Sequence, residues 1–299
     1  MKTTLFAVSF AVLATTVYAQ APQPDFSKVE IKTTKVSDNF YTLEGQGGTI
    51  GVLVGPDGIF MVDSQFAPLS QKIAAAIHQI SDKPIRFMVN THVHGDHTGG
   101  NENFAKMGVT IFSRDELRYR LAHPSPGANG APGVAAPAVA LPVVTYEGPV
   151  TIHMDGEDVH LIPIQRAHTD GDTLVYFPIN DVLMTGDYFR SIQYPNIDRV
   201  NGGSLNGMIE GLGITIGMAG PNTKIIPGHG ATVNRAAVIA HRDMILVVRD
   251  KVAALVAQGK TVDEVLAAKP TSDYDAIVPN SSMTSERFIR QLYAELKTN

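Results

Sequence analysis

The chain has 299 residues and a net charge of −5, and 44% of its residues are hydrophobic while 18% are charged. This composition is that of a globular protein with a sizeable core, so wholesale disorder is excluded. The acidic balance offers no electrostatic footprint for nucleic acid. Because the chain contains no cysteine, disulfide bonds, thiolate nucleophiles and cysteine-ligated zinc are excluded as well.

Residues 1–19 are predicted to be a signal peptide. Lys2 gives a positive start, an apolar run extends from Leu5 to Val17, and small residues precede a cut after Ala19. The alternative is an uncleaved membrane anchor, but the run is shorter than the roughly 20 residues that a transmembrane helix needs. We therefore expect a periplasmic or secreted protein, with a single domain over residues 20–299 and no stable membrane anchor after cleavage.

The first half of the mature chain is predicted to contain strands followed by helices. The strands are expected at Val29–Lys32, Phe40–Glu44, Thr49–Val54, Ile59–Val62, Ile85–Val89 and Val109–Phe112. Helical spacing of apolar residues is found at Pro68–Ile80, Asn101–Lys106 and Asp115–Leu121. Residues 124–142 are rich in alanine, glycine and proline, which predicts a long loop that either moves or covers a site.

The second half repeats this order. Strands are expected at Pro149–His153, Asp158–Ile164, Thr173–Phe177, Val182–Thr185 and Lys224–Ile226. Helices are expected at Leu205–Met218, Arg235–Val256, Val262–Ala267 and Ser285–Leu296, with Thr261 and either Thr284 or Ser285 as N-caps. Two such runs predict an α/β fold in which two halves pack face to face, with helices on the outside.

Histidines concentrate in one stretch, His92-Val93-His94-Gly95-Asp96-His97, directly after a predicted strand. Side chains two residues apart in a strand share a face, so we expect His92 and His94 to point the same way. The glycine permits a tight turn that brings Asp96 and His97 to a neighbouring position. Imidazole nitrogens and carboxylate oxygens suit Zn²⁺. The stretch therefore predicts a metal site, the alternative being a polar loop that is rich in histidine by chance.

Three further candidate ligands follow later strands: His168, Asp187 and His229. Each alone is more often an ordinary loop residue than a ligand. Together with the first motif they make seven groups, which is enough for two metal ions.

These residues, in this order, resemble the metal motifs of the metallo-β-lactamase superfamily. The resemblance covers nearly the whole mature chain and implies an αββα sandwich of two mixed β-sheets with helices on the outer faces. It also implies that one Zn²⁺ takes His92, His94 and His168, that the other takes Asp96, His97 and His229, and that Asp187 bridges them. Asp63 matches the family's carboxylate that supports the ligand loop, the alternative being a cap at the end of a strand.

The bridging position separates the subfamilies. Cysteine-bearing zinc β-lactamases hold a metal there with cysteine, whereas Asp187 resembles the arrangement in glyoxalase II and quorum-quenching lactonases. Arg190 lies where those lactamases place a lysine that holds the substrate carboxylate, and Asn196 lies where they have an asparagine near the substrate carbonyl. Both are candidate substrate-binding residues, and ordinary loop polarity is an equal alternative.

The expected function is that of an exported dinuclear zinc hydrolase acting on a small molecule. A hydroxide bridging the metals would cleave a carboxylic ester, lactone, thioester or amide, while Asp96 orients it and receives its proton. Iron or manganese would also accept these ligands. One alternative is a β-lactamase, motivated by export, Arg190 and Asn196. Another is a metal-binding accessory protein without catalysis. The sequence does not determine the oligomeric state.

Overall fold

The computed structural model describes residues 25–126 and 130–298. The predicted signal peptide lies outside these residues, so the cut after Ala19 stays a prediction. No helix among the described residues has the length and apolar character needed to cross a membrane.

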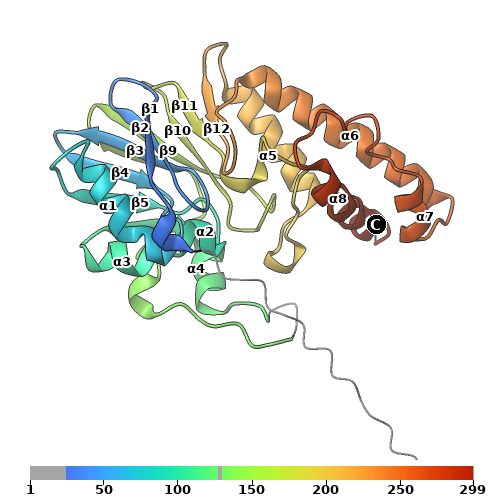
Figure 1. Ribbon diagram of the computed structural model, residues 1–299, viewed down its shortest axis with the longest axis horizontal. Coiled ribbons are helices and arrows are strands. Elements are labelled where there is room, and N and C mark those ends of the chain that lie inside the picture. Colours follow the sequence, from blue (N-terminus) through green and yellow to red (C-terminus); the bar gives the residue numbers. More distant parts are fainter. Residues whose placement is uncertain (1–24, 127–129, 299) are drawn as a thin grey trace, which may run out of the picture.

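A seven-stranded mixed sheet forms the first half of the fold (Figure 1). Its strands lie in sequence order: β1 (Lys32–Lys35), β2 (Phe40–Glu44), β3 (Ile50–Gly55), β4 (Gly58–Val62), β5 (Ile85–Val89), β6 (Thr110–Arg114) and β7 (Val144–Tyr146). The strands from β1 to β4 form an antiparallel meander, whereas those from β4 to β7 are parallel. Parallel strands need crossover connections, and here these contain α1 (Ser70–His78), α2 (Gly95–Thr98), α3 (Asn101–Lys106) and α4 (Asp115–Ala122).

A five-stranded sheet forms the second half. Its order is β12 (Lys224–Ile226), β11 (Val182–Met184), β10 (Thr173–Phe177), β9 (Glu157–Pro163) and β8 (Val150–Met154). Only β11 and β12 pair in parallel within this sheet, and α5 (Leu205–Met218) lies between them in the chain. The C-terminal part adds α6 (Arg235–Ala257), α7 (Val262–Ala267) and α8 (Ser281–Leu296) outside this sheet (Figure 1).

The strand period of two explains how the layers pack. In β4, Phe60 and Val62 contact residues of the other sheet, whereas Ile59 and Met61 belong to the cluster that includes α1 and α3. Successive side chains of a strand point to opposite faces, so a strand that is apolar throughout is buried on both faces. The second sheet is covered in the same way by α5, α6 and α8. The expected αββα sandwich is therefore confirmed.

Several predicted boundaries were wrong. The first strand is β1 at Lys32–Lys35 rather than Val29–Lys32, and β7 was missed because only three residues pair there. The last helix begins at Ser281, four residues before the predicted start. Its N-cap is Asn280 in a left-handed conformation with φ 53°. Thr284, a predicted N-cap, instead donates to the Asn280 carbonyl within the first turn.

The other predicted cap was right. Thr261 precedes α7 and forms a capping box with Glu264, in which each side chain accepts from the backbone N–H of the other residue.

Candidate metal centre

The ligand stretch lies in a loop rather than on a strand. β5 ends at Val89, so His92 and His94 converge through the loop before α2 and not through the pleat of a strand, as the sequence argument assumed. The single turn of α2 then returns the chain, which places the ring of His97 4.1 Å from that of His92 between centroids.

Asp63 holds this loop from the end of β4. Its Oδ1 accepts from the Thr91 N–H, and its Oδ2 accepts from the Thr91 hydroxyl and from Nδ1 of His97, each at 2.7 Å. Its backbone is left-handed with φ 64°, a conformation that aspartate and asparagine tolerate better than most residues. Because Nδ1 of His97 donates to this carboxylate, Nε2 keeps its lone pair and is directed at the cluster.

The three later candidates arrive from the second sheet and its loops. His168 follows β9, Asp187 lies in the short 3-10 helix η4 (Gly186–Tyr188) after β11, and His229 follows β12. Gly228 permits this approach, since a Cβ there would collide with Oδ1 of Asp187 and with the backbone of Gly186. Side chains that are up to more than 100 residues apart in the sequence therefore lie close together at the edge where the two sheets meet.

Seven side chains form two adjoining clusters. One contains His92, His94, His168 and Asp187, and the other contains Asp96, His97 and His229, with the ligand atoms of each within 4.8 Å of one another. Asp187 lies between them. Its Oδ2 is 3.5 Å from Nε2 of His92 and 3.7 Å from Nε2 of His168. Its Oδ1 is 3.4 Å from Nε2 of His97 and 3.5 Å from Nε2 of His229.

These residues fit metal ions. Among residues 25–126 and 130–298, Nε2 of His92 and Oδ1 of Asp187 are buried without a hydrogen-bond partner, which is costly unless another group satisfies them. The separations between the imidazole nitrogens and the oxygens of Asp187 are long for hydrogen bonds. Five imidazoles and two carboxylates form a donor set typical of zinc.

Each of the three imidazoles in the cluster of His92, His94, His168 and Asp187 is oriented by a partner outside that cluster. His92 places Nδ1 3.1 Å from the Thr91 hydroxyl, and His168 donates from Nδ1 to the Asn196 carbonyl at 2.6 Å. His94 is reversed, because its Nε2 lies 2.7 Å from Asp198 and its Nδ1 faces His168. Such partners fix the ring orientation and the tautomer of a ligand.

Burial keeps the inner histidines neutral. It lowers the pKa of His92 and His168 well below the usual range, and nearby imidazoles lower it further. Burial also lowers the pKa of His229, although the hydrogen bond to Asp96 opposes this. Neutral imidazole is the form that binds a metal ion.

A family model described as the metallo-beta-lactamase superfamily matches residues 43–240. The chain belongs to this superfamily. All seven cluster residues lie within the match.

Individual relatives are distant. The linear primary-alkylsulfatase of Pseudomonas sp. (strain ATCC 19151) is 23% identical over 257 residues, which cover 72% of this chain and 48% of the relative. The sec-alkylsulfatase Pisa1 from Pseudomonas sp. superposes with a TM-score of 0.65 at 18% identity, over 88% of this chain and 50% of that one. This chain thus spans about half the length of these alkylsulfatases.

A metallo-beta-lactamase from Pontibacter korlensis superposes with a TM-score of 0.59 at 18% identity, over 73% of this chain and 99% of that one. At these identities the two solved structures show the shared fold.

The two candidate substrate residues of this superfamily member have different surroundings. Arg190 pairs with Oδ2 of Asp187 and is mostly buried. The side chain of Asn196 is turned toward α8, where its Oδ1 accepts from Gln291 at 2.9 Å, while its backbone carbonyl receives His168.

Two supporting carboxylates were missed in the sequence. Asp198 contacts His94, and Asp172 accepts from the backbone N–H of His168 at 2.6 Å. Burial raises the pKa of Asp172 to about 7, although its hydrogen bonds from Thr169 and His168 oppose this. Asp172 follows His168 by four residues, a local signal that could have been used, whereas nothing in the sequence connects Asp198 with His94.

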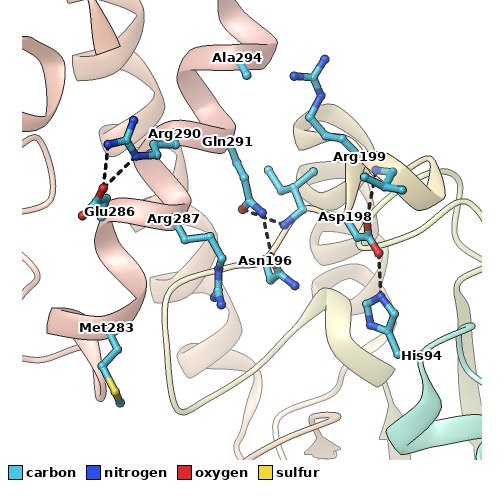
Figure 2. Close-up of a pocket in the computed structure, with 12 residues that line it drawn as sticks. His94, Asn196, Asp198, Arg199, Met283, Glu286, Arg287, Arg290, Gln291 and Ala294 are labelled. Atoms are coloured by element: carbon cyan, nitrogen blue, oxygen red, sulfur yellow. Dashed lines mark hydrogen bonds and ion pairs between the residues drawn. The ribbon is translucent and has the colours of Figure 1, made fainter. Parts of the chain in front are cut away.

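The metal centre opens toward solvent at His94, whose side chain is 25% exposed. On one side lies a pocket between α8 and residues 196–200 (Figure 2). On the other lies a smaller hollow lined in part by Pro124, Pro126 and Ala136. The proline-rich loop therefore borders the site.

Proposed function

We propose that the protein is a dinuclear zinc hydrolase that cleaves a carboxylic ester, lactone, thioester or amide of a small molecule. The observation that carries this proposal is the position of Asp187, which presents one carboxylate oxygen to each cluster. One cluster would hold a zinc ion with His92, His94 and His168, and the other with Asp96, His97 and His229, while Asp187 is shared. Two such ions supply Lewis acidity and lower the pKa of water into the neutral range.

Asp96 is the group that would receive a proton during the reaction. Its carboxylate lies 3.0 Å from Nε2 of His229 and is 23% exposed, so it can reach a substrate at the mouth of the site. Burial opposes its ionisation, but the hydrogen bond with His229 and the neighbouring His97 hold the pKa of this carboxyl well below its usual range. Asp96 is therefore ionised at neutral pH, which is the form of a carboxylate that binds a metal ion.

The other residues position these groups. Asp63, Thr91 and Asn196 set the direction of the imidazoles, and Arg190 neutralises part of the charge of Asp187. Because imidazole and carboxylate ligands discriminate weakly among first-row metals, iron or manganese would fit the same residues.

Hydrolysis of β-lactams is the second candidate. It is favoured by the cationic side chain of Arg190 beside Asp187, which could hold a substrate carboxylate, and it is opposed by the absence of cysteine. Because the chain is similar to two alkylsulfatases, we also propose to assay sulfate esters as substrates.

The decisive experiment combines metal analysis with a substrate panel. The purified protein is measured for metal content and assayed with nitrocefin, an acyl-homoserine lactone, a glutathione thioester, a p-nitrophenyl ester and an alkyl sulfate. We expect two zinc ions per chain and turnover of one carbonyl substrate. Asp96→Asn should lower kcat at least 100-fold, as loss of a proton acceptor commonly does, whereas Asp158→Asn on β9 should not.

Other outcomes would replace the proposal. Turnover of nitrocefin would establish a β-lactamase, and turnover of the alkyl sulfate alone would establish a sulfatase. Metal content near zero together with no turnover would favour an accessory protein without catalysis.

We also propose export, on the strength of the apolar N-terminal run. N-terminal sequencing of protein from the periplasm or the culture medium should begin at Gln20. Recovery of uncleaved protein from membranes would contradict export as a soluble protein.

A further inference from the structure

The pocket beside His94 has a volume of about 740 Å³ and is bounded by two segments, α8 and the loop at residues 196–200. In Figure 2, Arg287 and Gln291 extend from α8 toward this loop, and His94 lies at the opposite end of the pocket. A molecule bound at the metal centre would therefore extend between these two segments.

α8 is connected to the metal centre through Gln291. The side chain of Gln291 donates to Oδ1 of Asn196 at 2.9 Å and accepts from the Ile197 N–H at 3.0 Å. The backbone carbonyl of Asn196 in turn accepts a hydrogen bond from Nδ1 of His168. This pair of contacts sets the position of the helix relative to a candidate ligand.

Arg287 lies one turn before Gln291, and residues four apart share a helix face. It therefore faces the same pocket, yet its charge has no carboxylate partner among the described residues. Its Nε is buried with no hydrogen-bond partner in the described part of the chain, and the hydrogen bond from its guanidinium to the Tyr194 carbonyl is long, at 3.5 Å. By contrast, Arg290 on the same helix pairs with Glu286 at 2.8 Å.

A second guanidinium, that of Arg190, lies beside Asp187 and lines a separate hollow with Phe189 and His241. Arg190 pairs with Asp187, and its Nε is buried without a hydrogen-bond partner among the residues that the structure describes. Arg287 is therefore available to a ligand in the pocket beside His94, whereas Arg190 is held by Asp187.

We propose that Arg287 is a specificity-determining residue that binds an anionic oxygen group of the substrate, a carboxylate or a sulfate, at the α8 side of the metal centre. A guanidinium presents parallel N–H donors that match such a group in a bidentate arrangement. This inference rests on the proposed function. Arg287 lies on α8, which follows residues 43–240, so it is not part of the segment that the family model matches.

The test compares two esters that differ in charge: p-nitrophenyl butyrate and mono-p-nitrophenyl succinate. For Arg287→Gln in the zinc-loaded enzyme, we expect kcat/KM for the succinate ester to fall 10- to 100-fold, mainly through KM, as loss of a charged hydrogen bond predicts. The butyrate ester should change less than twofold. Arg287→Lys should restore part of the selectivity, and Arg290→Gln is the matched control on the same helix.

Equal losses on both esters would show that Arg287 only supports the fold, and no loss on either would also overturn the proposal. A measurement of anion binding tests the role of Arg287 even if the proposed hydrolase function is wrong. If the wild type hydrolyses neither ester, calorimetry with succinate and with inorganic sulfate still measures the subsite. Binding to the wild type and to Arg290→Gln, but at least tenfold weaker binding to Arg287→Gln, would support the inference, and the tighter anion would identify the group. Equal binding to all three proteins, or none to the wild type, would refute it.

Discussion

Replacing Asp63 with asparagine should weaken metal binding while leaving the fold intact. The carboxylate accepts three hydrogen bonds on two oxygens, two from Thr91 and one from His97. Asparagine keeps the size and tolerates the left-handed backbone at φ 64°, but it offers a single acceptor oxygen. At least one buried donor therefore loses its partner, or His97 changes tautomer and loses the Nε2 lone pair.

The magnitude follows from these contacts. A buried donor without a partner costs about 1–3 kcal/mol. Loss of a partner that orients a metal ligand commonly reduces affinity 10- to 100-fold, which corresponds to about 1.4–2.8 kcal/mol. The two estimates agree, so we expect one zinc ion, the one predicted to bind His97, to dissociate 10- to 100-fold more readily.

The assay is competition for zinc with a chromophoric chelator at pH 7.5, with circular dichroism to verify the fold. Asp155→Asn is the matched control, because Asp155 also has a left-handed backbone, with φ 58°, and caps a turn away from the metal centre. Unchanged affinity for both zinc ions in Asp63→Asn would refute the argument that this carboxylate orients His97.

Three further outcomes are expected. Saturating zinc at about 1,000 times its Kd should stabilise the chelator-treated protein by about 4 kcal/mol, a rise in Tm of roughly 10 °C; no rise would count against a built metal site. Gly228→Ala should cost about 1–3 kcal/mol and lower zinc content because its methyl collides with Asp187, whereas Gly213→Ala, where a Cβ meets nothing within 4 Å, should be neutral or stabilising in the same unfolding assay. Burial lowers the pKa of His241 to about 4, so the unfolded chain binds more protons below its ordinary pKa of about 6.5, and up to roughly 3 kcal/mol of stability should be lost as pH falls from 6.5 to 4. His241→Leu should lose less over this window in urea unfolding, and equal losses in both proteins would contradict this.

The sequence by itself determined most of the layered architecture. Strand alternation and helical spacing act over a few residues, so the layers and most elements could be predicted from them. The elements that could not be predicted are those whose position depends little on the conformational preferences of neighbouring residues. β7 has three residues and depends on pairing with β6, and the N-cap of α8 is an asparagine with positive φ rather than a threonine or serine.

The candidate metal ligands could also be named from the sequence, because imidazole and carboxylate groups are recognisable by residue type and order. The geometry of these ligands could not be predicted from the sequence. Only the tertiary structure places Asp187 between the two clusters and Asp63 against His97. The same holds for Asp198 on His94, and for Arg287 beside a pocket that α8 forms with a loop about 90 residues earlier. Such contacts join segments that approach each other only when the sheets and helices pack, and no local pattern in the chain encodes that approach.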